Sequence, residues 1–193
     1  MNTVIVKAEH EYSVLIGCDW SSTLVSSMKK RTRVALIVST SFIPDLSTIK
    51  SVDSDVHIFE VPDGEDAKSA NTLISLWNWL GAAGFTRSDL IVGIGGGAVT
   101  DLAGFTAATW LRGVDWIAVP TSLAGMVDAS VGGKCGIDFA GFKNQIGVFN
   151  TAKHTFVFPT FLQTLPGIEF WSGMAEMYKH ALIMDRDHWN TLK

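Results

Sequence analysis

The centre of the chain contains the sequence Asp89-Leu-Ile-Val-Gly-Ile-Gly-Gly-Gly-Ala-Val-Thr-Asp101. Its apolar start predicts a buried strand, and the residues from Ala98 onward predict a helix. The glycines between them allow the backbone to come close to a pyrophosphate, which the N–H groups of a helix N-terminus can bind. The spacing from Gly93 to Ala98 fits a tight turn packed against the sheet equally well, so this motif alone leaves both interpretations open.

The alternation of strand and helix continues on both sides of this motif. Short apolar runs that end at polar residues or proline predict strands, and apolar residues at helical spacing predict helices. The predicted strands are 34–38, 56–61, 89–94 and 116–119, and the predicted helices are 69–79 and 98–111. This order predicts an α/β fold, a doubly wound domain with a parallel sheet.

The pattern changes after Pro166. Residues 168–184 have helical spacing with no strand signal, and the chain ends soon afterwards at Lys193. One helix cannot bury its apolar face alone. We therefore expect residues 1–166 to form the α/β domain, and residues 167–193 to be the first helix of a truncated all-α domain whose remainder is absent.

Composition limits the possible classes of protein. The chain has 193 residues, of which 47% are hydrophobic and 18% charged, which excludes a disordered protein. A net charge of −4 argues against nucleic-acid binding through bulk electrostatics. The N-terminus has no secretory pattern, no apolar run is long enough for a membrane helix, and Cys18 and Cys135 are too few for a disulfide framework. These features predict a soluble cytoplasmic protein.

Several polar residues near the predicted strand ends are candidates for binding. We expect Asp101 in the first helical turn, where a carboxylate complements the helix dipole. Glu65 and Lys68 are three residues apart on one helix face, a spacing that by itself favours an ordinary ion pair. Thr121 and Ser122 follow a strand at the edge where open α/β sheets bind ligands, although they could equally cap the next helix.

A second group of polar residues lies in an otherwise apolar region after Val127. Asp128, Lys134, Asp138, Lys143 and Asn144 occur there, next to paired glycines. Lysines with few acidic neighbours can hold a phosphate or a carboxylate as point charges. We therefore favour an anion-binding site over an ordinary surface loop.

Glu176, Lys179 and His180 share one face of the last predicted helix. A glutamate and a histidine at this spacing can bind a divalent metal. A solvent-exposed Glu–Lys pair explains the same spacing at least as well, so both interpretations stay open.

Nine segments in chain order match one known family. They are Asp63-Gly-Glu-Asp-Ala-Lys68, Gly95-Gly-Gly-Ala-Val-Thr-Asp101, Arg112-Gly113, Val119-Pro-Thr-Ser122, Met126-Val-Asp-Ala-Ser-Val-Gly-Gly-Lys134, Gly136-Ile-Asp138, Lys143-Asn-Gln-Ile-Gly147, Phe161-Leu-Gln-Thr-Leu-Pro166 and Gly173-Met-Ala-Glu-Met-Tyr-Lys179. In these segments the chain resembles the 3-dehydroquinate synthase family of the shikimate pathway. The resemblance implies an NAD-dependent lyase that also needs Zn²⁺ or Co²⁺. Its substrate, 3-deoxy-D-arabino-heptulosonate 7-phosphate, is oxidised, loses phosphate, is reduced again and closes by an aldol step.

The resemblance also implies roles for individual residues. NAD contacts are implied for Asp63, Gly64, Glu65, Asp66, Ala67, Lys68, Gly96, Gly97, Ala98, Val99, Thr100, Asp101, Thr121, Ser122, Lys134, Lys143, Phe161, Leu162, Gln163 and Thr164. Catalytic or substrate contacts are implied for Asp128, Lys134, Asn144 and Lys179, and for Arg112 at the substrate phosphate across a homodimer interface. Glu176 is the implied metal ligand. The other two ligands are histidines expected beyond Lys193, and His180 occupies neither position.

Two departures qualify the resemblance. Because ligands are expected outside this chain, we expect these residues to be inactive by themselves. The loop Ser39-Thr40-Ser41-Phe42 also lacks the acidic residue that often binds the adenosine ribose. Alternatives are another sugar phosphate cyclase, a polyol dehydrogenase-like protein and a non-catalytic nucleotide-binding module.

Overall fold

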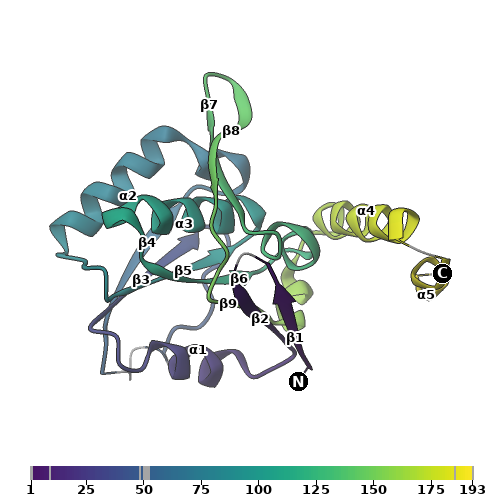
Figure 1. The fold of residues 1–193 in the computed structure, drawn as a ribbon, viewed down its shortest axis with the longest axis horizontal. Helices are drawn as coiled ribbons and strands as arrows, with labels where there is room; N and C mark the ends of the chain where they lie inside the picture. Colours follow the sequence, from purple (N-terminus) through teal and green to yellow (C-terminus); the bar gives the residue numbers. More distant parts are fainter. Residues whose placement is uncertain (1, 9, 48, 50–52, 185, 193) are drawn as a thin grey trace.

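The computed structural model describes residues 2–8, 10–47, 49, 53–184 and 186–192, and it contains a seven-stranded sheet (Figure 1). The strand order is β1-β2-β9-β6-β5-β3-β4, and all neighbours run parallel except β1 and β2. The bounds are β1 Asn2–Lys7, β2 Glu11–Ile16, β3 Arg33–Ser39, β4 Asp55–Val61, β5 Leu90–Gly95, β6 Asp115–Pro120 and β9 His154–Val157. The prediction of an α/β fold with a mainly parallel sheet is confirmed.

Helices cover both faces of this sheet. α1 (Trp20–Met28) lies on one side, and α2 (Ala70–Ala82) and α3 (Gly97–Thr109) lie on the other (Figure 1). Successive residues of β3 enter different apolar clusters: Ile37 packs with the α2 and α3 side, and Leu36 and Val38 pack with the α1 side. Burial on both faces explains why β3 and β5 are apolar throughout.

The predicted elements of this layer are present with adjusted ends. The predicted helix 98–111 is shorter, because α3 ends at Thr109 and a 3-10 turn, η3 (Trp110–Arg112), follows. Leu111 has φ 48° and ψ 27° there, which breaks the helical path. The structure also contains an N-terminal hairpin, β1–β2, and the helix α1, none of which the sequence pattern predicted.

A second hairpin stands on the α3 face of the sheet (Figure 1). β7 (Lys134–Phe139) pairs antiparallel with β8 (Phe142–Phe149), and the two connecting residues, Ala140 and Gly141, have φ 51° and 81°. Positive φ at both positions is the geometry of the tight turns that suit a hairpin. The anion-binding residues predicted between 128 and 144 therefore lie on a hairpin and on the short π-helical turn before it, η4 (Gly125–Ala129).

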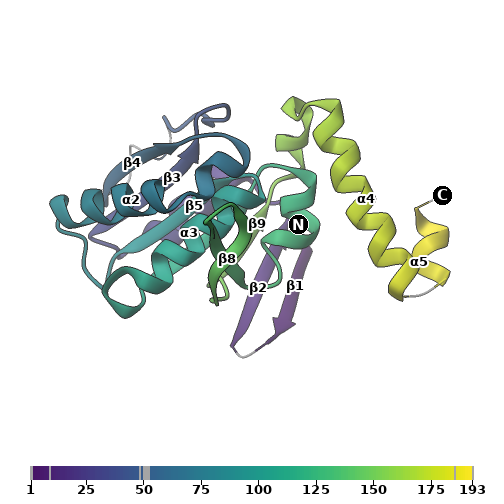
Figure 2. The same cartoon turned by 90° about the horizontal axis from the view of Figure 1, so that it is seen from above.

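The C-terminal helices lead away from the sheet (Figure 2). η5 (Pro159–Thr164) is followed by α4 (Gly167–Met184), as the sequence predicted, and by α5 (Arg186–Thr191). A Cβ at Gly173 would lie 2.5 Å from Leu123 Cβ, so α4 touches the residues after β6 closely. Among the described residues, no helix is both long and apolar enough to cross a membrane.

Candidate functional site

Strand β5 and helix α3 meet at the turn Gly95–Gly97. A Cβ at Gly95 would lie only 2.6 Å from Val99 Cβ, so the helix packs closer to the strand than a side chain would allow. Gly96 is the N-cap of α3 and has no side chain to bond the first helical N–H groups. These groups and the positive end of the helix dipole are therefore available to a ligand beside the turn.

A cavity of about 820 Å³ lies beside this turn, and we call it the glycine cavity. It is lined by Ser39, Ser41, Phe42, Ile43, Asp63, Gly64, Glu65, Gly96, Gly97, Ala98, Val99, Thr121, Ser122, Ala124, Phe161, Thr164, Leu165, Pro166 and Glu169. These residues come from the carboxyl ends of β3, β4, β5 and β6 and from the region of η5. Ligands of open α/β proteins bind at this edge of the sheet.

The glycine cavity brings together part of the predicted cofactor set. Asp63, Gly64, Glu65, Gly96, Gly97, Ala98, Val99, Thr121, Ser122, Phe161 and Thr164 line it, whereas Asp66, Ala67, Lys68, Thr100, Asp101, Lys134, Lys143, Leu162 and Gln163 do not. Ala67 and Thr100 are buried, and the Thr100 hydroxyl donates to the Gly97 carbonyl at 2.9 Å. The Ser122 hydroxyl oxygen also accepts a hydrogen bond from the Gly125 N–H at 3.2 Å. Ser122 therefore caps the turn that follows it and lines the cavity as well.

Sequence reasoning missed several lining residues of this cavity. Ser39 is the last residue of β3, and Ser41 and Phe42 follow it closely, so they line the cavity because β3 lies next to β5 in the sheet. Their position after a predicted strand was a usable signal. No sequence signal indicates that Glu169 lines the cavity, because its position depends on how α4 folds back beside η5.

A second cavity of about 650 Å³ lies between α3 and the hairpin, and we call it the hairpin cavity. Its lining is Asp101, Asp128, Ala129, Gly132, Lys134, Cys135, Gly136, Asn144, Gly147, Val148 and Phe149. Three predicted catalytic residues, Asp128, Lys134 and Asn144, therefore meet there. Burial raises the pKa of the Cys135 thiol to about 12, so this lining residue stays protonated and is a poor nucleophile.

Lys68 links the linings of the two cavities. Its side chain is only 4% exposed, and its Nζ lies 2.9 Å from Asp101 Oδ2 and 3.7 Å from Glu65 Oε1. It also donates to the Asn144 amide oxygen. Glu65 in turn lies 3.7 Å from Lys143 Nζ. One buried cation thus holds a residue of the glycine cavity, a residue of α3 and a residue of the hairpin in fixed positions.

The expected role of Asp101 at the helix N-terminus is wrong. The first turn of α3 contains no acidic residue, and Asp101 is the fifth residue of the helix that begins at Gly97. Burial raises the pKa of the Asp101 carboxyl, and the hydrogen bond and charge of Lys68 oppose this shift. The ion pair with Lys68, rather than the helix dipole, stabilises its charge.

Potential metal ligands gather where α4 meets η4. One ligand atom from each of Asp128, Glu176 and His180 lies within 4.8 Å of the others. His180 Nε2 is shielded from solvent without a hydrogen-bond partner, and Asp128 Oδ1 is 3.7 Å away. Glu176 also forms the expected ion pair with Lys179, whose pKa is raised by the hydrogen bond to that carboxylate. Sequence spacing could not find this cluster, because Asp128 is far from α4 along the chain.

Two predicted catalytic residues lie outside both cavities. Arg112 is on the exposed turn η3, with φ 67°, at the far end of α3 from the glycine turn. Lys179 pairs with Glu176 on α4 and lines neither cavity. Neither of them lines the hairpin cavity, which contains Lys134 and Asn144.

Comparisons with known proteins agree on the relatives of this chain. The model of the family described as 3-dehydroquinate synthase N-terminal matches residues 58–172. The 3-dehydroquinate synthase of Streptomyces avermitilis is 42% identical over 179 residues, which are 90% of this chain and 49% of that protein. The chain thus spans about half the length of the curated relatives it matches.

Solved structures share the fold. The 2-epi-5-epi-valiolone synthase of Streptomyces hygroscopicus subsp. jinggangensis, with NAD⁺ and Zn²⁺ bound, is 28% identical with a TM-score of 0.81, over 94% of this chain and 52% of that one. A 2-deoxy-scyllo-inosose synthase complexed with carbaglucose-6-phosphate, NAD⁺ and Co²⁺ has a TM-score of 0.87 at 23% identity, over 96% and 53%. This second likeness concerns the fold alone. From the family match and the relatives together, the chain belongs to the 3-dehydroquinate synthase family and contains its N-terminal region.

Proposed function

We propose that this chain is the NAD-binding part of a 3-dehydroquinate synthase, which converts 3-deoxy-D-arabino-heptulosonate 7-phosphate into 3-dehydroquinate and phosphate. The carrying observation is the pair of cavities on either side of Lys68. The N-terminus of α3, whose first N–H groups have no side-chain cap, lines the glycine cavity. Asp128, Lys134 and Asn144 line the hairpin cavity, and Asn144 accepts a hydrogen bond from Lys68. A dinucleotide beside a small anionic substrate requires this kind of arrangement.

The glycine cavity fits NAD. Any side chain at Gly95 would push α3 away, so the glycines keep the backbone N–H groups of Gly97 and Ala98 close to the cavity, as pyrophosphate binding requires. Thr121 and Ser122 also line this cavity. A dinucleotide held there would supply reversible hydride transfer. The structural relative with bound NAD⁺ supports this assignment.

The hairpin cavity fits the substrate. Lys134 supplies a positive charge for a phosphate or carboxylate, and Asn144 can bond a hydroxyl while Lys68 holds its amide oxygen. Asp128 supplies a carboxylate that can accept a hydroxyl proton. Fixing the substrate through these groups aligns its reacting carbon with the neighbouring cofactor cavity. We further propose that Arg112 and Lys179 act on the substrate only in the complete, homodimeric and cytoplasmic protein.

The cluster where α4 meets η4 fits a divalent metal. Carboxylate oxygens of Asp128 and Glu176 and a nitrogen of His180 are ligand types that Zn²⁺ or Co²⁺ accepts. When bound, the ion makes a substrate hydroxyl more acidic. Of these three residues we propose only Glu176 as the resident ligand, with two histidines supplied from outside this chain, while Asp128 faces the substrate.

The activity can be tested with a chimera. Residues 1–193 replace the corresponding half of the Streptomyces avermitilis relative, and phosphate release from 3-deoxy-D-arabino-heptulosonate 7-phosphate is measured with NAD and Zn²⁺. We expect release by the chimera and none by the chain alone. Lys134→Ala should reduce the rate about a hundredfold, because the substrate anion loses its anchor.

The matched control is Lys153→Ala, which removes an exposed lysine that pairs with Asp115, outside both cavities. It should leave the rate unchanged. A folded chimera that binds NAD but releases no phosphate would contradict the proposal, as would turnover by the chain alone. Steady accumulation of NADH on a polyol would favour the dehydrogenase alternative.

A further inference from the structure

Asp128, which faces the substrate in the proposed function, lies on an unusual turn of the backbone. In η4 the Ser130 N–H donates to the Gly125 carbonyl at 3.1 Å, one residue further back than in an α-helix. Asp128 is exposed, and its Oδ1 lies 3.7 Å from His180 Nε2, which is too far for a hydrogen bond. The position of this carboxylate therefore depends on the backbone of the turn.

The start of this π-helical turn is anchored from within and from the strand before it. The Ser130 hydroxyl donates to the Gly125 carbonyl at 2.7 Å, so this carbonyl accepts two hydrogen bonds. A Cβ at Gly125 would lie 3.1 Å from Pro120 Cβ, so the turn begins directly against the end of β6. Met126 packs into the apolar cluster on the α1 side of the sheet.

The end of the turn is bonded by hydroxyl groups from two neighbouring strands. Thr155 on β9 is fully buried, and its hydroxyl donates to the Ser130 carbonyl at 3.0 Å. Tyr12 on β2 is 5% exposed, and its hydroxyl donates to the Val131 carbonyl. Burial raises the pKa of the Tyr12 hydroxyl, so this group stays protonated and can donate. Because β2 and β9 pair directly, both donors come from one part of the sheet.

These two hydroxyl groups bond the turn rather than their own strands. Their acceptors are the carbonyls of the two residues that directly follow η4. Phenylalanine and valine in place of Tyr12 and Thr155 would fill the same space but would leave these carbonyls without a donor. Tyr12 and Thr155 line neither the glycine cavity nor the hairpin cavity, so their contribution to the site is indirect.

We propose that Tyr12 and Thr155 are positioning residues, which hold the π-helical turn so that Asp128 stays in the lining of the hairpin cavity. The inference rests on the proposed function, because it concerns the carboxylate that is proposed to accept a substrate proton. Neither residue lies in any of the nine segments that carry the family resemblance.

The first test follows amide hydrogen exchange of the 193-residue chain by NMR. Thr155→Val and Tyr12→Phe each remove one hydroxyl with little change in shape. Each should speed exchange of the Ser130 and Val131 N–H groups about tenfold relative to the amides of β5, because the turn opens more readily. A variant that leaves these relative rates unchanged would overturn the role of its residue.

Two further variants serve as controls for this measurement. Thr155→Ser keeps the hydroxyl and should keep the wild-type rates, whereas fast exchange in this variant would assign the effect to packing. Thr106 is also fully buried, but its hydroxyl donates to the Leu102 carbonyl of its own helix at 2.8 Å. Thr106→Val should leave the relative rates at Ser130 and Val131 unchanged. Faster exchange there would show that the effect is not specific to the two strand residues.

The second test measures turnover in the chimera that contains residues 1–193. Thr155→Val and Tyr12→Phe should each lower kcat/KM about tenfold, because a misplaced carboxylate reacts less often. If the loss acts through Asp128, the same variants should cost less than about twofold in an Asp128→Asn background. A merely structural role would give the same loss in both backgrounds and would overturn the positioning role. Thr106→Val should keep the wild-type rate.

The outcomes separate this inference from the proposed function. An active chimera in which the variants speed exchange but leave kcat/KM unchanged would overturn the positioning role alone. A folded wild-type chimera that releases no phosphate would overturn the proposed function and, with it, the role of Asp128. The exchange measurement would still decide whether Tyr12 and Thr155 hold the turn.

Discussion

Ser39 controls the charge of Asp63 through its hydroxyl group, which makes the pKa of Asp63 a test at the level of one residue. The folded-state pKa lies below the ordinary 3.8, so this carboxylate favours the folded state above that pH. The contribution is lost as the pH falls through the lowered pKa. Ser39→Ala should raise the pKa of Asp63 toward 3.8 in a carboxyl NMR titration. An unchanged pKa would contradict the hydrogen bond, with Asp45 as the reference carboxylate.

Lys68 is the buried cation between the two cavities. Lys68→Met leaves the Asp101 carboxylate buried without its ion-pair partner, so the free energy of unfolding should fall by about 3 kcal/mol. The pKa of Asp101, already raised by burial, should rise further. Urea unfolding measures the first effect and carboxyl NMR the second.

Lys143→Met is the matched control for Lys68. The Lys143 side chain is 73% exposed and forms an ion pair with Glu65 at 3.7 Å, so its loss should change stability by less than about 1 kcal/mol. Equal effects of the two variants would show that the buried network does not stabilise the fold as described.

Elements of the central sheet were predictable because burial on both faces makes β3 and β5 apolar throughout. The hairpin was not predictable by the same rule. All eight residues of β8 are exposed, so polar residues such as Lys143 and Asn144 interrupt its pattern. For the site, sequence motifs located Gly95–Gly97 and Lys134, but the partners of Asp101 and Asp128 lie on distant segments that only the folded chain brings together.

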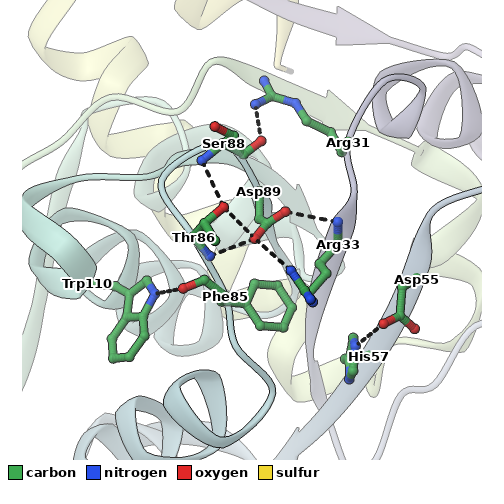
Figure 3. Close-up of polar contacts among 9 residues, drawn as sticks. All are labelled: Arg31, Arg33, Asp55, His57, Phe85, Thr86, Ser88, Asp89 and Trp110. Carbon is green, nitrogen blue, oxygen red and sulfur yellow. Dashed lines mark hydrogen bonds and ion pairs between the residues drawn. The ribbon is translucent and has the colours of Figure 1, made fainter.

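The amino-terminal end of β5 contains a polar cluster with a structural role (Figure 3). Asp89 is fully buried, and its carboxylate accepts from the backbone N–H groups of Arg33 and Thr86 at 2.9 and 2.6 Å. Asp89→Asn should lower the free energy of unfolding by about 1–3 kcal/mol, because the charged acceptor is lost.

The same variant should leave NAD affinity unchanged, since Asp89 lies at the opposite end of β5 from the glycine turn. Chemical denaturation and calorimetry together check both parts. A stable variant with weakened NAD binding would contradict the structural role of this cluster.

At the scale of the whole molecule, the two apolar clusters formed by the described residues lie within the α/β layers. Both apolar clusters extend no further along the chain than Leu162, while Ile168, Trp171, Leu182, Ile183 and Met184 on α4 are exposed. A chain of residues 1–166 should therefore keep a cooperative thermal transition, which circular dichroism measures. Loss of that transition would contradict the predicted domain boundary at Pro166.

The central claim is that NAD binds at the carboxyl edge of the sheet, against the N-terminus of α3. Hydrogen–deuterium exchange of the 193-residue chain with and without saturating NAD tests it most directly. We predict slower exchange in residues 62–66 and 96–101 and no change in residues 86–92, at the other end of β5. Unchanged exchange around the glycine turn, with protection elsewhere or none, would contradict the account.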